Sequence, residues 1–186
     1  LLELTAENTH SRIYYYLMDS GYDQHSVYSL IRDKYQAQAI IPLNNRSAKQ
    51  PKAGLDWDGT PICSAGYRMV YWGYYNAENK FRCPHVLGKC DCPFGSAWCS
   101  ESNYGMVVKT KVKEDPRLFC IPHRGTANWQ KFYNLRTYSE RCFSRFKENL
   151  GLETGLTIRK IKKVEAHAYL CAITMIAAVI AVNQGS

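Results

Sequence analysis

The sequence predicts an α/β protein whose core is interrupted by a cysteine-rich, β-containing insertion. A strand-like run at residues 11–18 precedes a helical pattern and a second apolar run, which is the order of a strand–helix–strand unit. Two further helical patterns occupy residues 129–150 and 164–182. Between the strand–helix–strand unit and these helices, from residue 54 to about residue 123, the composition shifts to Gly, Tyr, Trp and Cys. We therefore assign residues 1–45 and 124–186 to the core and residues 46–123 to the insertion.

The first strand is expected at residues 11–18, SRIYYYLM, which is rich in aromatic and β-branched side chains. Asp19 ends it, and a helix over residues 25–34 follows, with Asp23 expected to cap that helix. A second strand is expected at residues 38–43. Strand–helix–strand order predicts that the two strands are parallel and joined by a crossover.

The insertion is expected to be a small β-rich subdomain. Asp58-Gly59 is a turn signal, and residues 104–112 alternate in part as a strand does. The polar segment 44–53, which contains Pro51, marks its beginning.

The helix predicted at residues 129–150 carries a polar stripe. At about 100° per residue, Tyr133, Arg136, Glu140 and Lys147 fall within an arc of roughly 60°. The stripe places one carboxylate among cations, which suits a metal ligand beside groups that bind phosphates. Solvated charges on an ordinary amphipathic helix are the alternative interpretation. Trp129 is predicted to be a core residue rather than a side chain that stacks on a displaced base.

The last helix, expected at residues 164–182, is apolar but short for spanning a membrane. We expect it to be a buried helix packed on a sheet, and we expect no membrane partner.

The charge distribution indicates a nucleic-acid partner. The chain of 186 residues has 24 Lys and Arg against 16 acids, a net charge of +8. Residues 1–103 hold ten of each sign, whereas residues 104–186 hold 14 cations and six acids. The excess therefore surrounds the polar stripe, as expected of a surface that binds phosphates in a salt-dependent manner.

The spacing Tyr-x2-Arg-x3-Glu-x6-Lys in YNLRTYSERCFSRFK resembles the signature of a large branch of insertion-sequence DDE transposases. Upstream, IYYYLMDSGYDQHSVYSLI is similar to that family's strand ending in the second catalytic Asp, and VEAHAYLCAITMIAAVIAVN is similar to its last core helix. The resemblance covers most of the chain, but only loosely between residues 46 and 123. It implies a partial ribonuclease-H-like core.

The resemblance also implies a chemistry: metal-dependent phosphodiester cleavage and strand transfer at transposon ends. Asp19 corresponds to the second Asp and Glu140 to the Glu of an Asp-Asp-Glu triad that holds Mg²⁺ or Mn²⁺. Hard divalent cations prefer such carboxylate oxygens. The chain begins at Leu1 without a strand for the first Asp, so we interpret it as the C-terminal catalytic portion of a longer enzyme, inactive alone.

Phosphate contacts are expected from the remaining stripe residues and their neighbours. The DNA-binding candidates are Tyr133, Arg136, Lys147, Arg141 and Arg145. By resemblance, the partners are double-stranded DNA, as terminal inverted repeats and target, and a second copy in a synaptic complex. The implied location is the cytoplasm of a prokaryotic-type cell, at the nucleoid.

The cysteines of the insertion suggest a structural zinc site. Zinc prefers thiolate and imidazole ligands in a tetrahedral arrangement, although the spacing here is not a regular pair of CxxC motifs. Buried reduced thiols are the alternative. The candidate zinc ligands are Cys63, Cys83, His85, Cys90, Cys92 and Cys99.

Two functional classes stay open on the sequence alone. The first is the catalytic portion of a DDE transposase. The second is a non-catalytic, zinc-stabilised DNA-binding remnant of a truncated transposase. A disulfide-rich extracellular domain is disfavoured by the transposase-like motifs.

Overall fold

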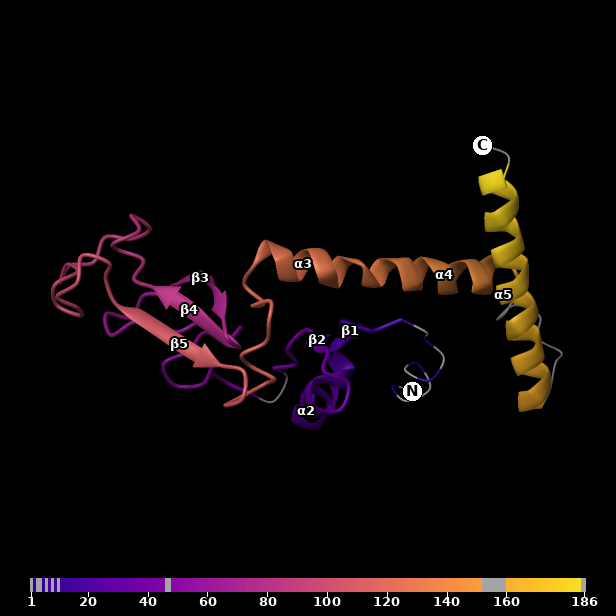
Figure 1. Ribbon diagram of the computed structural model, residues 1–186, viewed down its shortest axis with the longest axis horizontal. Helices are drawn as coiled ribbons and strands as arrows, with labels where there is room; N and C mark the ends of the chain where they lie inside the picture. Colours follow the sequence, from indigo (N-terminus) through magenta and orange to yellow (C-terminus); the bar gives the residue numbers. More distant parts are fainter. Residues whose placement is uncertain are drawn as a thin grey trace. The chain divides into compact units, whose positions relative to one another are not determined.

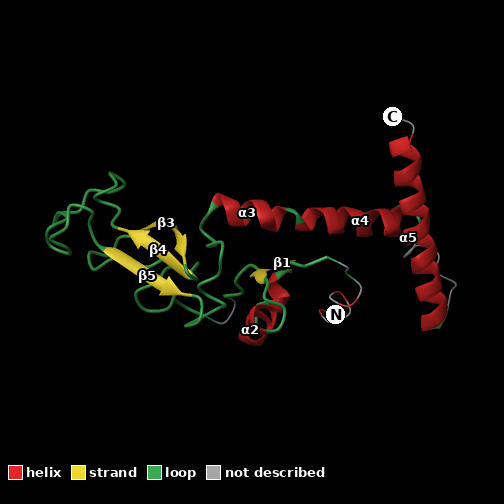
Figure 2. Cartoon of the chain, in the orientation of Figure 1, coloured by secondary structure: helices red, strands yellow, loops and turns green. Residues whose placement is uncertain are grey.

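The computed structural model describes residues 2, 5, 7, 9, 11–45, 48–151 and 160–184 (Figure 1). The predicted start of the insertion, residues 46 and 47, lies outside them. The chain divides into two compact units, residues 1–134 and 135–186, which are described separately. The first unit is mixed α/β, and the described part of the second is helical (Figure 2).

The first unit contains the predicted strand–helix–strand. Strand β1 (Tyr15–Leu17) leads through the short 3-10 helix η1 (Ser20–Tyr22) into α2 (His25–Asp33) and then β2 (Gln38–Ile40). The two strands are parallel, with Tyr16 opposite Ala39, as expected. Both strands are shorter than predicted because only these three-residue segments are paired.

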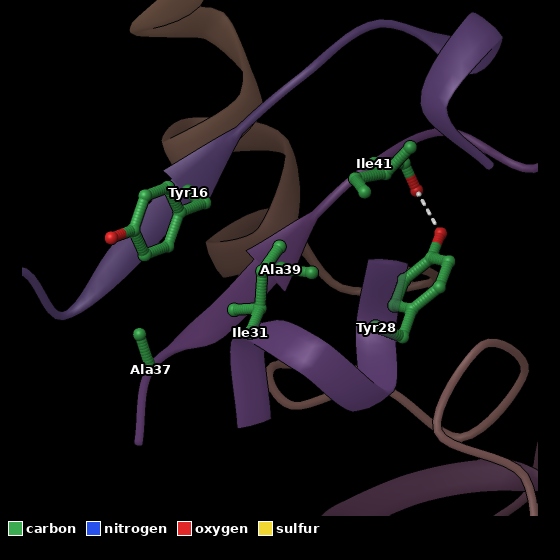
Figure 3. Close-up of a cluster of buried hydrophobic side chains, with 6 residues drawn as sticks. All are labelled: Tyr16, Tyr28, Ile31, Ala37, Ala39 and Ile41. Atoms are coloured by element: carbon green, nitrogen blue, oxygen red, sulfur yellow. Dashed lines mark hydrogen bonds between the residues drawn. The ribbon is translucent and has the colours of Figure 1, made fainter. Parts of the chain in front are cut away.

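Alternation along this small sheet places a hydrophobic core on each of its faces. On one face Tyr16 and Ala39 pack against α2 (Figure 3). On the other face Ile40 packs with Trp129 of α3 (Ala127–Asn134). The result is a helix–sheet–helix arrangement within the first unit, and it confirms Trp129 as a core residue, 6% exposed.

The insertion contains a three-stranded antiparallel sheet, in agreement with a β-rich subdomain. Its strands are β3 (Val70–Tyr75), β4 (Glu78–Arg82) and β5 (Val107–Lys111), with β4 in the centre. Between β3 and β4 the register shifts at Trp72, as in a β-bulge. Phe81 and Asn79 are fully buried on one face. The other face is open to solvent at Lys109 and Lys111, whereas Arg82 on that face is only 7% exposed.

The single helix predicted over residues 129–150 is wrong. Two helices occur instead, α3 and α4 (Arg136–Glu148), interrupted at Leu135. There the amide of Tyr138 donates to the carbonyl of Leu135 at 3.1 Å. This bond spans three residues, as in a 3-10 helix, whereas α-helical bonds span four. No Pro or Gly marks this interruption, so the periodicity of the sequence extends across it unchanged.

In the second unit, α4 contacts α5 (Ile161–Gln184). Among the described residues of that unit only Cys171 is buried, so the sheet-packed position expected for α5 stays a prediction. The expectation that this helix is short for spanning a membrane is wrong, because α5 has 24 residues instead of the predicted span of 164–182. By length and composition it could cross a membrane, a property that it shares with core helices of soluble proteins.

Candidate functional site

Asp19 lies two residues after the end of β1, close to the strand end as the sequence predicts, and its side chain is exposed. Its Oδ1 accepts a hydrogen bond from the Gly21 amide at 2.7 Å and so caps η1. A Cβ at residue 21 would lie only 2.9 Å from that oxygen, so glycine permits the close turn. The carboxylate is therefore held at the carboxyl end of a strand in a parallel pair, where α/β proteins commonly place functional groups.

Asp23 does not cap α2, contrary to the sequence prediction. The N-cap residue is Gln24, which makes no side-chain capping bond. The Asp23 side chain is instead fully buried, and the Arg117 guanidinium donates two hydrogen bonds to its carboxylate, at 3.0 and 2.7 Å. Tyr28 and the Asn44 amide also donate to this carboxylate. Asp23 thus has a structural role, joining the strand–helix–strand unit to the end of the insertion.

The signature residues are divided by the interruption at Leu135. Tyr133 lies at the end of α3, where its ring stacks on that of Trp129 with a centroid distance of 5.1 Å. Arg136, Glu140 and Lys147 all lie on α4 in the second unit. Tyr133 is partly buried against the core, so it is less accessible to DNA than an exposed stripe residue would be.

On α4, Arg136 and Glu140 form an ion pair one helical turn apart, with Nη1 and Oε1 2.8 Å from each other. The Glu140 side chain is 53% exposed. Arg141, Arg145 and Lys147 are also exposed on this helix. The helix therefore presents a solvent-accessible carboxylate among cations, which is the composition expected of a metal ligand next to phosphate-binding groups.

Asp19 and Glu140 belong to different units, so their proposed convergence stays a prediction. Within the first unit, however, α3 is tied to the strand that ends in Asp19. Phe132, next to Tyr133, stacks on Tyr15 of β1 with a centroid distance of 4.3 Å and an interplanar angle of 26°. The beginning of the signature segment is thus packed on the Asp19 strand.

All eight cysteines are unpaired thiols. Three of the candidate zinc ligands, Cys63, His85 and Cys92, each begin a tight turn. In each turn the carbonyl of the first residue accepts from the amide of a glycine three positions later, at 2.8–3.1 Å. Those glycines adopt φ values of +65° to +81°; they are Gly66, Gly88 and Gly95. Structural zinc sites commonly take their ligands from such tight turns.

The remaining candidates lie near these turns. The Cys92 amide donates to Nδ1 of His85 at 3.3 Å, and burial together with the neighbouring thiols raises the pKa of Cys90 and that of Cys99. Nevertheless, within the described ranges no three His, Cys, Asp or Glu side chains are placed together so as to hold a metal ion. The donor types suit zinc, whereas the side-chain positions do not form its coordination shell.

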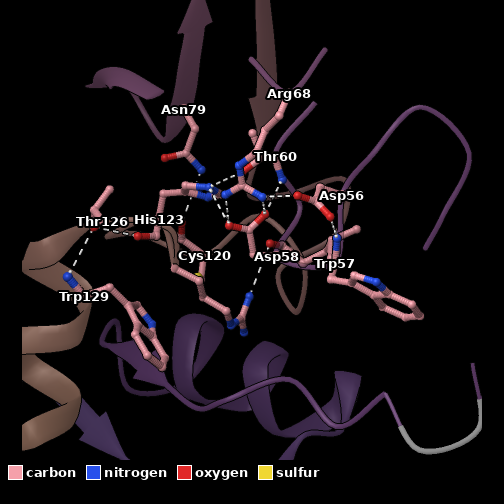
Figure 4. A network of polar contacts seen from close by, with 12 residues as sticks. Asp56, Trp57, Asp58, Thr60, Arg68, Asn79, Cys120, His123, Thr126 and Trp129 are labelled. Carbon is pink, nitrogen blue, oxygen red and sulfur yellow. Dashed lines mark hydrogen bonds and ion pairs between the residues drawn. The ribbon is translucent and has the colours of Figure 1, made fainter. Parts of the chain in front are cut away.

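A polar network around His123 was missed by the sequence analysis (Figure 4). His123 is 1% exposed, and its Nε2 lies 2.8 Å from the Thr60 hydroxyl and 3.8 Å from Asp58. Arg68 bridges Asp58 and Asp56. No regular spacing links these positions, which are brought together only by the fold.

The network sets the protonation of its members. Burial lowers the pKa of His123 to about 4, against the opposing effect of Asp58. Burial alone would raise the pKa of Asp58, but hydrogen bonds from Arg68 and Thr60 leave it below its ordinary value. A Cβ at Gly125 would lie 2.7 Å from Asp58 Oδ2, so a larger residue here would have to displace that carboxylate from its place in the network. The network therefore contains a neutral histidine beside an ionised, paired aspartate. Its contacts connect the start of the insertion to His123, in the segment before α3.

Comparisons of the chain with protein-family models, curated proteins and solved structures find no match.

Proposed function

We propose that this chain is the C-terminal catalytic portion of a DDE-type DNA transposase with a ribonuclease-H-like core. The observation that carries the proposal is the packing of α3 on β1. It attaches the start of the Tyr-x2-Arg-x3-Glu-x6-Lys segment to the strand that ends in Asp19, through Tyr15 and Phe132. The Asp19 motif and the first signature residue, Tyr133, thereby lie in one layered unit.

The arrangement of the first unit supports this proposal. A parallel strand pair has helices on both faces, and an exposed carboxylate follows the first strand. Glu140 supplies a second exposed carboxylate from α4. Asp19 and Glu140 would hold Mg²⁺ or Mn²⁺, which would neutralise charge on the attacking and leaving oxygens of a phosphodiester.

The other residues of α4 would position DNA. Arg136 already pairs with Glu140, so it would orient that carboxylate in the absence of metal and contact a phosphate oxygen when DNA is present. Arg141, Arg145 and Lys147 add exposed positive charge along the same helix. In the complete protein, double-stranded terminal repeats and a second copy would be the partners.

The proposal is tested by Mg²⁺-dependent cleavage of terminal-repeat DNA with the complete protein that carries this chain. Asp19→Asn retains an acceptor for the Gly21 amide but removes the charge that would bind metal, so cleavage should fall at least a hundredfold, roughly the loss of one catalytic group. Asp33→Asn, an exposed carboxylate on α2, is the matched control and should cleave normally. Equal activity of the two variants would remove Asp19 from the site.

A structural zinc in the insertion is a second element of the proposal. It is favoured by the three glycine-ended turns at Cys63, His85 and Cys92. Because the side chains do not form a coordination shell as placed, binding would require their rotation toward a common point. The zinc would stabilise the insertion and take no part in the chemistry.

A further inference from the structure

The open face of the three-stranded sheet carries an unusual concentration of positive charge. Side chains alternate along β4 and β5, so the residues of these strands that share this face are Glu78, Lys80, Arg82, Val107, Lys109 and Lys111. Arg82 is only 7% exposed, so three lysines and one carboxylate, Glu78, provide the solvent-accessible charge of this face. Glu78 contacts both Lys109, at 3.1 Å, and Lys111, at 3.9 Å, and cannot neutralise both.

One pair on this face opposes the stability of the sheet. Lys80 and Lys109 are direct cross-strand partners. Like charges in this position repel and are destabilising, so the pair is better suited to an anionic ligand than to the isolated sheet. The buried face behind it, formed around Phe81 and Asn79, keeps the two lysines directed to solvent.

Two aromatic rings complete the surface. The bulge in β3 brings Trp72 onto Arg82, whose guanidinium carbon is 4.4 Å from the indole centroid and 3.4 Å from the ring of Tyr104. Arg82 also donates to the Tyr104 carbonyl at 2.7 Å, and Lys80 donates to the Tyr104 hydroxyl at 3.1 Å. The rings are thereby fixed, yet Trp72 remains 49% exposed and Tyr104 39% exposed.

We propose that this sheet face, formed by Trp72, Lys80, Tyr104, Lys109 and Lys111, binds a single DNA strand. The lysines would contact successive phosphates, and the fixed, exposed rings would stack on unpaired bases. An acidic peptide would use the lysines but gain little from flat, exposed rings, so the aromatic component favours a nucleic acid. The inference extends the proposed function by adding a DNA surface far in sequence from the signature segment.

The test uses the full 186-residue chain and a short, fluorescently labelled single-stranded oligonucleotide, with anisotropy titrations at several salt concentrations. Lys109→Ala combined with Lys111→Ala should weaken binding about tenfold and reduce the salt dependence by roughly two charges. A charge-matched control combines Lys49→Ala and Lys113→Ala, two exposed lysines outside the sheet face, and should bind as the unmodified chain does.

Stacking is tested separately. Trp72→Ala should weaken binding roughly tenfold, whereas Trp72→Phe retains a ring and most of the affinity. Circular dichroism of each variant establishes that the sheet is intact. If the Lys109 and Lys111 double variant binds like its control, or if polyglutamate competes as well as DNA does, the inference is wrong.

The inference and the proposed function fail independently. Loss of binding in an Arg136→Ala, Lys147→Ala double variant, with the sheet variants unaffected, would overturn the sheet surface and leave the transposase proposal standing. Conversely, normal cleavage by the Asp19→Asn enzyme would overturn the catalytic proposal, while weakened strand binding by the sheet variants would still establish the surface.

Discussion

Phe132 of α3 stacks on Tyr15 of β1, and this contact joins the signature segment to the strand that ends in Asp19. The stacked rings lie at the edge of the core that contains Ile40 and Trp129. The contact explains how a helix more than a hundred residues further along the chain is brought to the first strand.

A double-mutant cycle of Tyr15→Ala and Phe132→Ala should yield a coupling energy of about 0.5–1.5 kcal/mol in the free energy of unfolding, as for other aromatic pairs. Urea denaturation of the chain, its two single variants and the double variant measures it. Strictly additive effects would show that the rings do not stack in solution.

Asp23 and Arg117 should matter more to stability than an exposed ion pair does. Asp23→Ala removes a buried carboxylate and leaves the Arg117 guanidinium without its two bonds, which should cost about 3 kcal/mol of unfolding free energy. Asp33→Ala breaks the exposed pair with Arg32 and should leave the denaturation midpoint nearly unchanged. Similar losses in the two variants would contradict the structural role assigned to Asp23.

The lowered pKa of His123 predicts a specific dependence of the free energy of unfolding on pH. Its pKa of about 4 lies below the ordinary 6.5, so the unfolded chain takes up a proton more readily than the folded one. Stability is therefore complete above about pH 6.5 and falls as the pH decreases toward 4, by at most about 3 kcal/mol. The pKa of Asp58 lies below 3.8, so this group loses its contribution at lower pH.

Thermal unfolding between pH 4 and 7 tests this dependence. A His123→Gln variant retains a hydrogen-bonding group toward Thr60 but does not titrate, so its stability should vary less across that range. A pH dependence identical to that of the unmodified chain would assign the effect to other groups.

Zinc is tested by metal analysis of the purified chain. One equivalent of zinc is expected, and Cys63→Ser combined with Cys92→Ser should abolish it, because each residue begins one of the glycine-ended turns. The control pair is Cys142→Ser and Cys171→Ser, on α4 and α5, which should leave the zinc content unchanged. An unmodified chain without zinc would favour reduced thiols as the state of these cysteines.

The strand–helix–strand unit was predictable because its signals are local. Residues 15–17 are Tyr, Tyr and Leu, residues 39–41 are Ala, Ile and Ile, and a helical pattern of the right length separates the two segments. The position of Asp19 follows from the same pattern. The structure also confirms the parallel pairing and the β-rich character of the insertion, which were predicted from local patterns of the same kind.

Two of the three features that the sequence did not reveal depend on contacts between distant segments. The partner of Asp23 is Arg117, at the far end of the insertion, and no local rule distinguishes such a residue from a helix cap. The interruption at Leu135 is a change in backbone hydrogen bonding without a helix-breaking residue. The His123 network likewise joins positions more than sixty residues apart.

The role of Glu140 is the central claim, and it is tested in the complete protein by measuring cleavage and end binding side by side. Glu140→Gln keeps the shape of the side chain but removes the charge that would hold Mg²⁺. The matched control is Glu148→Gln, an exposed carboxylate two turns further along α4. A gel-shift titration should show that both variants bind terminal-repeat DNA, while Mg²⁺-dependent cleavage is lost only in Glu140→Gln. Cleavage by Glu140→Gln at the rate of the unmodified enzyme would contradict the account and leave α4 as an ordinary charged helix.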